Sequence, residues 1–224
     1  MARKADPQAR EALIAAARRE FLRSGLAKAR VEDITAAVGL SKGAFYLHFP
    51  SKESLFTQLV MAFTTEVSAY SEARELLTRA VVARLQHARA ESVAKELLAL
   101  DAEQDRKLLE LLWPWRDVCE VLISGAAGTA FGGVLWKLLD SQMARLHLEF
   151  EELQRSKLVR ADLPRELLAE MVVGTYLLLT RRLVTLNEKP DFTPWVGALH
   201  AVLSHGIGVT TSEFARVQSN TRKS

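Results

Sequence analysis

Residues 31–49 read VEDITAAVGLSKGAFYLHF, and this stretch decides the fold. The apolar spacing over Val31 to Val38, and again after Ser41, is that of two short helices, and Gly39 lies between them. Gly accepts the positive φ that a tight turn needs, and Ser is a good N-cap for the helix that follows. The pattern predicts a helix-turn-helix, whose second helix can enter the major groove of DNA.

A helix precedes this motif. Asp6 and Pro7 predict its N-terminus, and Gly25 predicts its end. Six residues of the motif are expected to hold its helices against the first one: Ile34, Ala37, Val38, Leu40, Phe45 and Phe49. This leaves Lys42, Gly43, Ala44, Tyr46 and His48 to face outward.

The outward residues have the chemistry of a DNA contact surface. Lys42 can reach base acceptors or phosphate, and the small Gly43 and Ala44 let the backbone approach base edges. Tyr46 and His48 can donate hydrogen bonds to phosphate oxygens, as can Lys52 at the start of the next helix. An amphipathic helix pair in an ordinary helical bundle would have the same spacing, so that interpretation stays open.

Composition and charge agree with a helical protein that binds a polyanion at one end. The chain has 224 residues, enough for one or two domains, and it is 49% hydrophobic and 25% charged. Ala, Leu, Glu and Arg dominate, and all are strong helix formers. The net charge is +3; residues 1–60 hold 10 Lys and Arg against 6 Asp and Glu. The basic excess therefore lies at the N-terminal end, where it either attracts DNA or is simply solvated.

The rest of the chain is predicted to be helical too. Ser51 can cap a fourth helix, the segment Asp101 to Gln104 resembles a capping box at a helix start, and Trp113-Pro114-Trp115 predicts a break. Further helices are expected near 115–124, 134–158, 164–187 and 194–217. The predicted domains are a DNA-binding domain at 1–55, an effector-binding and dimerisation domain at 56–218 and a tail at 219–224.

The last two helices are apolar around much of their circumference, which predicts burial on several sides. Pairing with the same helices of a second subunit would bury them in a homodimer, although a large monomeric core would do so as well. A small-molecule effector would lie among the middle helices. Its candidate lining residues are Trp113, Trp115, Arg116, Trp136, Met143 and His147.

Catalysis, metal binding and membrane insertion are not expected. The single cysteine, Cys119, has apolar neighbours and no nucleophile motif around it, so we interpret it as a buried small residue. No histidines are paired at metal-ligand spacing, and no cofactor fingerprint is present. The N-terminus lacks the apolar core of a signal peptide, and no stretch is long enough to span a bilayer, which predicts a cytoplasmic protein.

The sequence also resembles a known family. The run from Ala36 to Phe49, with Val31 to Ile34 before it and Pro50 to Leu55 after it, is similar to the TetR family of one-component bacterial transcription regulators. The resemblance implies an all-α homodimer with an N-terminal three-helix DNA-binding domain and a larger helical domain that binds a small effector. It also implies DNA contacts by eight residues: Arg30, Ser41, Lys42, Gly43, Ala44, Tyr46, His48 and Lys52.

One position departs from the family pattern. Many relatives have Thr at the cap of the second helix, where this chain has Arg30, which cannot accept a hydrogen bond from a backbone N–H. The expected function is a repressor that leaves a palindromic operator when its effector binds. Activation instead of repression, a helical enzyme or carrier with a vestigial helix-turn-helix, and a structural interaction protein are the alternatives.

Overall fold

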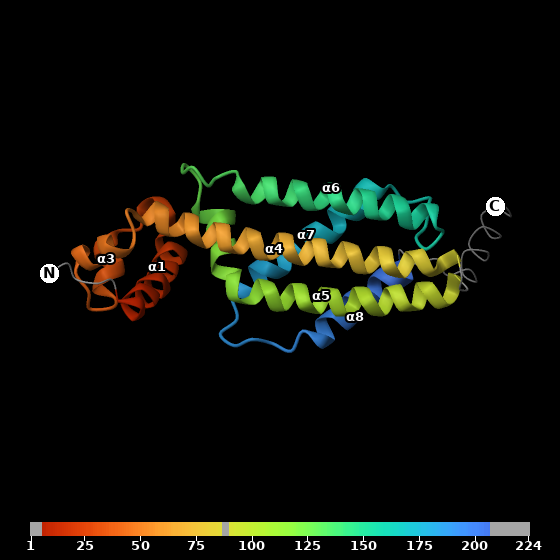
Figure 1. Ribbon diagram of the computed structural model, residues 1–224, viewed down its shortest axis with the longest axis horizontal. Coiled ribbons are helices and arrows are strands. Elements are labelled where there is room, and N and C mark those ends of the chain that lie inside the picture. The colour runs from red at the N-terminus through yellow and green to blue at the C-terminus, as the bar shows by residue number, and fades with distance from the viewer. Residues whose placement is uncertain (1–5, 87–89, 207–224) are drawn as a thin grey trace, which may run out of the picture. The chain divides into compact units, whose positions relative to one another are not determined.

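The computed structural model describes residues 6–86 and 90–206, and Figure 1 shows the course of its helices. These residues form α-helices and no strand, which confirms the predicted all-α class. The helices are α1 (Pro7–Lys28), α2 (Val31–Ala36), α3 (Lys42–His48), α4 (Lys52–Val82), α5 (Ala90–Glu120), α6 (Val134–Arg155), α7 (Arg165–Val184) and α8 (Thr193–Gly206). A 3₁₀ turn at Ala83–Gln86 follows α4, and a π-helical turn at Val121–Gly125 follows α5.

The chain divides into two compact units. Unit 1 takes its residues from 1–70, 111–141 and 176–189, and unit 2 takes its residues from 71–110, 142–175 and 190–224. The helices α4, α5, α6 and α7 therefore each contribute to both units. The boundary that the sequence predicts at residue 55 separates a DNA-binding part from an effector-binding part, and it stays a prediction.

Aromatic side chains form much of the core of unit 1. The Phe21 ring on α1 meets the Phe56 ring on α4 edge to face, with 5.5 Å between the ring centroids. The Phe56 ring in turn meets Phe131 edge to face at 5.0 Å. Since such pairs add to the free energy of burial, they tie α1 and α4 to the segment that follows α5.

The end of α1 also lies directly against the π-helical turn. Gly25 has φ 72° and ψ 157°, a conformation that is essentially restricted to glycine. A Cβ atom added there would lie 3.2 Å from the carbonyl oxygen of Gly125. Two helix turns earlier, Arg18 bonds Asp117 through Nε at 2.7 Å and also bonds the carbonyl oxygen of Pro114. Backbone contact and charge together hold α1 on the segment 111–141.

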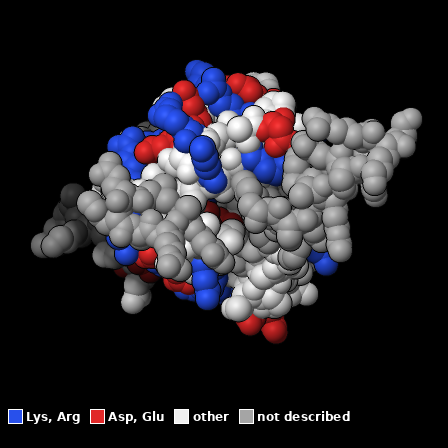
Figure 2. Space-filling model, turned by 90° about the vertical axis from the view of Figure 1, so that its right-hand side faces the viewer, with Lys and Arg blue, Asp and Glu red and all other residues white. Residues whose placement is uncertain are grey.

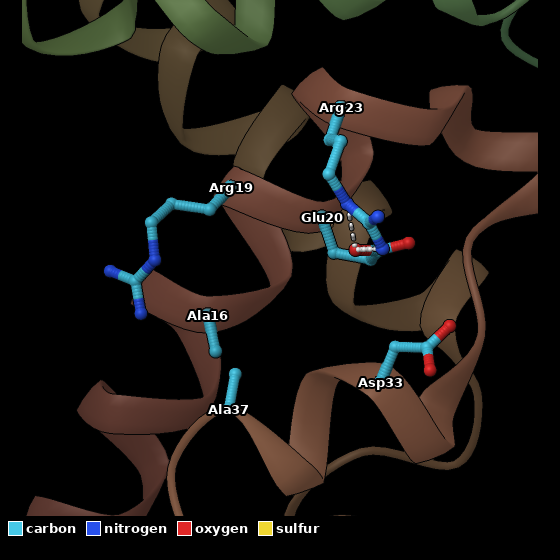
Figure 3. A pocket seen from close by; sticks show the side chains of 6 residues that line it. All are labelled: Ala16, Arg19, Glu20, Arg23, Asp33 and Ala37. Atoms are coloured by element: carbon cyan, nitrogen blue, oxygen red, sulfur yellow. Dashed lines mark hydrogen bonds and ion pairs between the residues drawn. The ribbon is translucent and has the colours of Figure 1, made fainter.

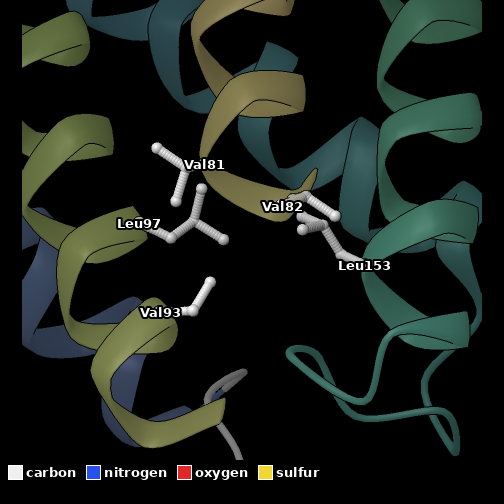
Figure 4. Packing of buried hydrophobic residues seen from close by; sticks show 5 residues of the cluster. All are labelled: Val81, Val82, Val93, Leu97 and Leu153. Atoms are coloured by element: carbon white, nitrogen blue, oxygen red, sulfur yellow. The ribbon is translucent and has the colours of Figure 1, made fainter. Parts of the chain in front are cut away.

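The core of unit 2 contains a cluster of aliphatic side chains, which we call the valine cluster. It consists of Val81, Val82, Val93, Leu97 and Leu153, from α4, α5 and α6. Figure 4 shows these side chains converging between the three helices. On the face shown in Figure 2, Lys and Arg are interspersed with Asp and Glu over the described surface. Ion pairs of unit 2 include Arg155–Glu151 and Arg160–Asp162.

Two predicted helix boundaries inside α5 are wrong. The helix continues through Pro114, where a break was expected. Proline removes one intrahelical hydrogen bond, but Leu112 and Val118 on either side are buried, and the Pro114 carbonyl oxygen accepts a bond from Arg18. The expected capping box at Asp101 to Gln104 is not a helix start either, because it lies in the middle of α5.

Other predicted bounds are close to the observed ones. Asp6 accepts a hydrogen bond from the N–H of Gln8 and caps α1, as expected, and Ser51 likewise caps α4 through the N–H of Ser54. The predicted helix at 115–124 is in fact the end of α5 and the π-helical turn. The expected helices at 134–158 and 164–187 end three residues early, at 155 and 184. Residues 207–217 of the last expected helix and the expected tail lie outside the described residues.

Candidate nucleic-acid interface

The motif at 31–49 folds as two short helices joined by a tight turn. Gly39 has φ 68°, as the turn requires, and the N–H of Leu40 donates to the Thr35 carbonyl oxygen at 2.9 Å. The Ser41 hydroxyl accepts a hydrogen bond from the N–H of Ala44 at 3.2 Å and caps α3. Arg30 precedes α2 and makes no side-chain capping bond to the described chain, as its chemistry predicts.

Buried side chains hold the two helices against α1. Ile34 and Phe45 are fully buried and Phe49 is 1% exposed, as expected from their spacing. Ala37 was expected in this core, but it is exposed. Thr35 is buried instead, because its hydroxyl can donate to the Glu32 carbonyl oxygen within the helix and so needs no contact with water. The orientation of α3 is therefore fixed by its apolar residues.

The opposite face of α3 is open to solvent. Lys42, Gly43 and Tyr46 are exposed, and Tyr46 is 55% exposed although it is aromatic. Ala44 and His48 are half-buried. Sequence reasoning missed Leu47, which is 54% exposed beside Tyr46 and adds apolar surface to this face. Apolar side chains on such a face can contact thymine methyl groups.

Two of the predicted DNA contacts share a carboxylate that the sequence analysis overlooked. Glu32 on α2 pairs with the Lys42 ammonium on α3, and its carboxylate lies 4.0 Å from Nε of Arg30. The bond to Lys42 lowers the pKa of Glu32 below its usual value, so Glu32 carries a full negative charge at neutral pH. Without DNA, the two cations are thus partly neutralised by their own chain.

Lys52 occupies a different environment. Its Nζ donates to the carbonyl oxygens of Ala29 at 2.7 Å and Ala27 at 3.0 Å, at the C-terminal end of α1, and only 18% of its side chain is exposed. An ammonium group has three donors; the third is not used by these two bonds, and the Glu53 carboxylate lies 3.8 Å from Nζ. Lys52 therefore also joins α4 to the end of α1, a role that its sequence position did not indicate.

A shallow pocket lies between α1 and α2 in the same unit. Figure 3 shows its lining residues: Ala16, Arg19, Glu20, Arg23, Asp33 and Ala37. Arg23 pairs with the buried Glu20 at 2.6 Å, whereas Arg19 points away from this pair. Since two arginines face two carboxylates, the pocket has no net charge to attract phosphate. The exposed face of α3 remains the better candidate for DNA contact.

The structure does not bring the six predicted effector-lining residues together in one unit. Trp113, Trp115, Arg116 and Trp136 belong to unit 1, whereas Met143 and His147 belong to unit 2. Arg116 stacks on the Trp113 ring at 3.8 Å, and Nε1 of Trp115 donates to Glu66 at 2.8 Å. Trp136 is 56% exposed. Their role in effector binding stays a prediction.

Cys119 is buried, as the sequence analysis interpreted it. Burial raises the pKa of its thiol to about 12, so it is not a nucleophile at neutral pH. Within 6–86 and 90–206, no group of three or more His, Cys, Asp and Glu could hold a metal ion. None of the helices in those ranges is both long and apolar enough to cross a membrane.

Comparison with known proteins identifies the motif. Residues 13–59 match the family model described as bacterial regulatory proteins, tetR family. Residues 13–59 therefore resemble the TetR family. The resemblance predicted from Ala36 to Phe49 is therefore confirmed.

Two curated relatives match part of this chain. The uncharacterised HTH-type transcriptional regulator YdgC of Bacillus subtilis is 35% identical over 65 residues, which are 29% of this chain and 33% of YdgC. The HTH-type transcriptional repressor DhaR of Mycobacterium sp. strain GP1 is 38% identical over 58 residues, which are 26% of this chain and 29% of DhaR. The matches thus span a third or less of the curated relatives.

The fold extends beyond the matched domain. The transcriptional regulator FadR from Bacillus subtilis, solved in complex with stearoyl-CoA, has a TM-score of 0.56 and 21% identity to this chain. The likeness covers 88% of this chain and 98% of FadR. The TetR-type domain is therefore joined to helices arranged as in a regulator of the same fold.

Proposed function

We propose that the protein is a homodimeric transcription regulator of the TetR family, a repressor that binds a palindromic DNA operator in the cytoplasm and leaves it when a small molecule binds. The observation that carries the proposal is the exposed face of α3. Ser41 caps this helix, Phe45 and Phe49 hold it against α1, and Lys42 and Tyr46 face outward. A recognition helix needs this combination of a fixed orientation and a free polar face.

The contacts on DNA divide by chemistry. Lys42, Gly43, Ala44 and Tyr46 face the groove, where Lys42 reaches base acceptors. Arg30, Ser41, His48 and Lys52 lie at the ends of the short helices and of α4, where they contact phosphates. The groove residues select the sequence, and the phosphate contacts set the register of the protein on the duplex.

Exposed apolar residues support a dimer. Leu167, Met171 and Leu178 recur at helical spacing on α7, and all three are about half exposed or more; Val202 on α8 is 73% exposed. Large apolar side chains gathered on a surface mark an interaction site. Pairing of α7 and α8 with the same helices of a second subunit would cover them and place two recognition helices roughly 34–36 Å apart, one helical turn of DNA.

Release by an effector follows from this spacing. A ligand that binds more tightly to a dimer with another spacing lowers operator affinity in proportion to that difference. FadR of Bacillus subtilis shows that a regulator of this fold holds a small ligand, stearoyl-CoA. The rival proposal, a ligand-binding protein that no longer recognises DNA, predicts no preference among duplex sequences.

Selection of bound duplexes from a random-sequence pool tests the proposal and supplies the operator. Lys42→Ala should weaken operator binding by roughly fivefold to a hundredfold while changing non-operator binding much less. Lys107→Ala, which removes an exposed lysine from α5, is the matched control. Lys52→Ala should weaken all duplexes about equally and flatten the salt dependence. Recovery of no common sequence, or equal loss in the Lys42 and Lys107 variants, would refute the assignment.

Sedimentation tests the subunit arrangement. The wild type should sediment as a dimer, and Leu178→Asp should shift it toward a single subunit, because a buried charge without a partner opposes association. Leu76→Asp, at another exposed leucine, is the control and should leave the dimer intact. A wild type that sediments as one subunit would contradict the dimer.

A further inference from the structure

Unit 2 contains a cluster of charged side chains that are largely buried. Arg74 on α4 bonds Asp105 through Nη1 at 3.1 Å and Asp101 through Nη2 at 3.4 Å, both on α5. His200 on α8 lies with Nε2 2.8 Å from the second carboxylate oxygen of Asp105. We call Arg74, Asp101, Asp105 and His200 the charge cluster. No more than about a quarter of each side chain is exposed.

The charges of this cluster do not balance. Among the described residues, Asp105 bonds both Arg74 and His200, whereas Asp101 has the longer bond to the same arginine, and Glu149 on α6 adds a repulsive negative charge. Burial, which Arg74 offsets only in part, raises the pKa of Asp101 to about 6. Arg145 on α6 pairs with Glu75 instead. Within residues 6–86 and 90–206, three carboxylates thus lie near one arginine and one histidine, so the described side chains around Asp101 carry more negative than positive charge.

A buried hydroxyl beside the cluster also lacks a partner. Thr78 is 5% exposed, and its Oγ1 has no hydrogen-bond partner among the described residues. Threonines in helices commonly donate to the carbonyl oxygen one turn earlier, as Thr175 and Thr180 do on α7, but Thr78 does not. A buried polar atom without a bond calls for an explanation, such as a ligand.

Thr78 lies along α4 between the charge cluster and the buried valine cluster. It lies one helix turn after Arg74 and one turn before Val82 on the same face of α4. Arg74 reaches Asp101 and Asp105, and Val82 belongs to the valine cluster with Leu97 (Figure 4). Thr78 therefore lies on the face of α4 that carries Arg74 and Val82, between the charges and the apolar side chains.

We propose that this part of unit 2 binds an organic cation, a protonated amine carried on an apolar chain. The ammonium group would bond the Asp101 carboxylate and the Thr78 hydroxyl, with Glu149 adding attraction, and the chain would lie on the valine cluster. An anionic ligand would face the surplus of carboxylates instead. The inference rests on the proposed function in one respect, because it makes this cation the effector.

Calorimetric titration of the full-length protein with three ten-carbon probes tests the charge preference. Decylamine, decanol and decanoate have the same chain and differ in the charge of the head, and each is used below its micelle-forming concentration. Decylamine should bind most tightly and decanoate least. Asp101→Asn should weaken decylamine by roughly tenfold or more, as expected for a hydrogen-bonded ion pair. It should leave decanol unchanged.

Two further variants test whether decylamine binds at the charge cluster. Asp162→Asn removes an exposed carboxylate that pairs with Arg160 in the same unit, and it should leave decylamine binding unchanged. Thr78→Val keeps the side-chain shape and should weaken decylamine by roughly twofold to tenfold. Lowering the pH below the pKa of Asp101 should weaken decylamine in the wild type but not in Asp101→Asn, because only the carboxylate form attracts the amine.

The outcomes separate the site from the proposed function. Decanoate binding as tightly as decylamine, or equal binding by Asp101→Asn and the wild type, would overturn the site even if the protein selects an operator. Decylamine bound through Asp101 that fails to release duplex DNA would support the site and refute its role as the effector site. Release of DNA from the wild type but not from Asp101→Asn would support both.

Discussion

Glu32→Gln should raise DNA affinity without adding any contact to DNA. Glu32 pairs with Lys42 and lies near Arg30, two of the proposed DNA contacts. A tetrahedral ammonium that bonds Glu32 and a phosphate at once holds the two oxygens roughly 5 Å apart. Repulsion between two negative charges at that distance in water weakens binding by a factor of roughly four. A dimer that carries the substitution in both subunits should therefore bind duplex DNA roughly fifteenfold more tightly at low salt.

The salt dependence provides a second magnitude. Each lysine or arginine that becomes free to neutralise a phosphate steepens the slope of log K against log salt by roughly 0.9. Glu32→Gln should thus steepen the slope by up to roughly twice that value in the dimer. Because the gain is electrostatic, it should be similar for operator and random-sequence duplexes, and the ratio of the two affinities should not rise.

Fluorescence anisotropy with a random-sequence duplex, from about 50 to about 200 mM salt, measures both quantities. Glu103→Gln is the control, because it makes the same change of net charge at an exposed residue of α5 that pairs with Arg106. Combination with Lys42→Ala should remove most of the gain. If Glu32→Gln and Glu103→Gln have the same affinity and slope, Glu32 does not restrain the DNA-binding cations.

Two predictions concern stability and are measured by urea unfolding followed by circular dichroism. Gly25→Ala should lower the unfolding free energy by about 3 kcal/mol or more, because the added Cβ is strained at this φ and ψ and also lies close to Gly125. Gly39→Ala should lower it by only about 1–2 kcal/mol. At Gly39 nothing in the described chain lies within 4 Å of an added Cβ. Equal losses would show that the close contact has no energetic effect. Asp101 has a higher pKa in the folded state than in the unfolded chain, so the folded state binds the proton more tightly. As the pH rises from about 4 to about 6, loss of this proton should lower the unfolding free energy of the wild type by up to roughly 3 kcal/mol. Asp101→Asn should lack this dependence, and coincident pH profiles of the two proteins would contradict the raised pKa.

Features encoded by neighbouring residues could be predicted from the sequence. Asp6, Ser41 and Ser51 cap the helices that they precede, and Gly25 and Gly39 adopt the positive φ that their positions indicated. These signals are readable because a cap or a turn involves only a few residues of one segment. The buried Phe45 and Phe49 followed from helical spacing for the same reason.

Features that depend on distant segments could not be predicted. The Asp101 to Gln104 pattern resembles a capping box, but Asp101 pairs with Arg74, which lies on another helix. Pro114 stays within α5 with the help of Arg18, almost a hundred residues away in the chain. The pairing of Glu32 with Lys42 depends on the angle between α2 and α3, which counting charges along the sequence does not reveal.

The backbone contact between Gly25 and Gly125 limits how this protein can be re-engineered. A chimera that grafts residues 1–50 onto an unrelated sensor would separate Gly25 from Gly125 and would remove Asp117 from Arg18. Substitutions on α3 alone should therefore be enough to change the DNA sequence that is recognised. Transfer of residues 1–50 to another protein should also require residues 111–141 of this chain. In this chain, residues 1–50 cannot be moved to another protein without the segment that they pack against.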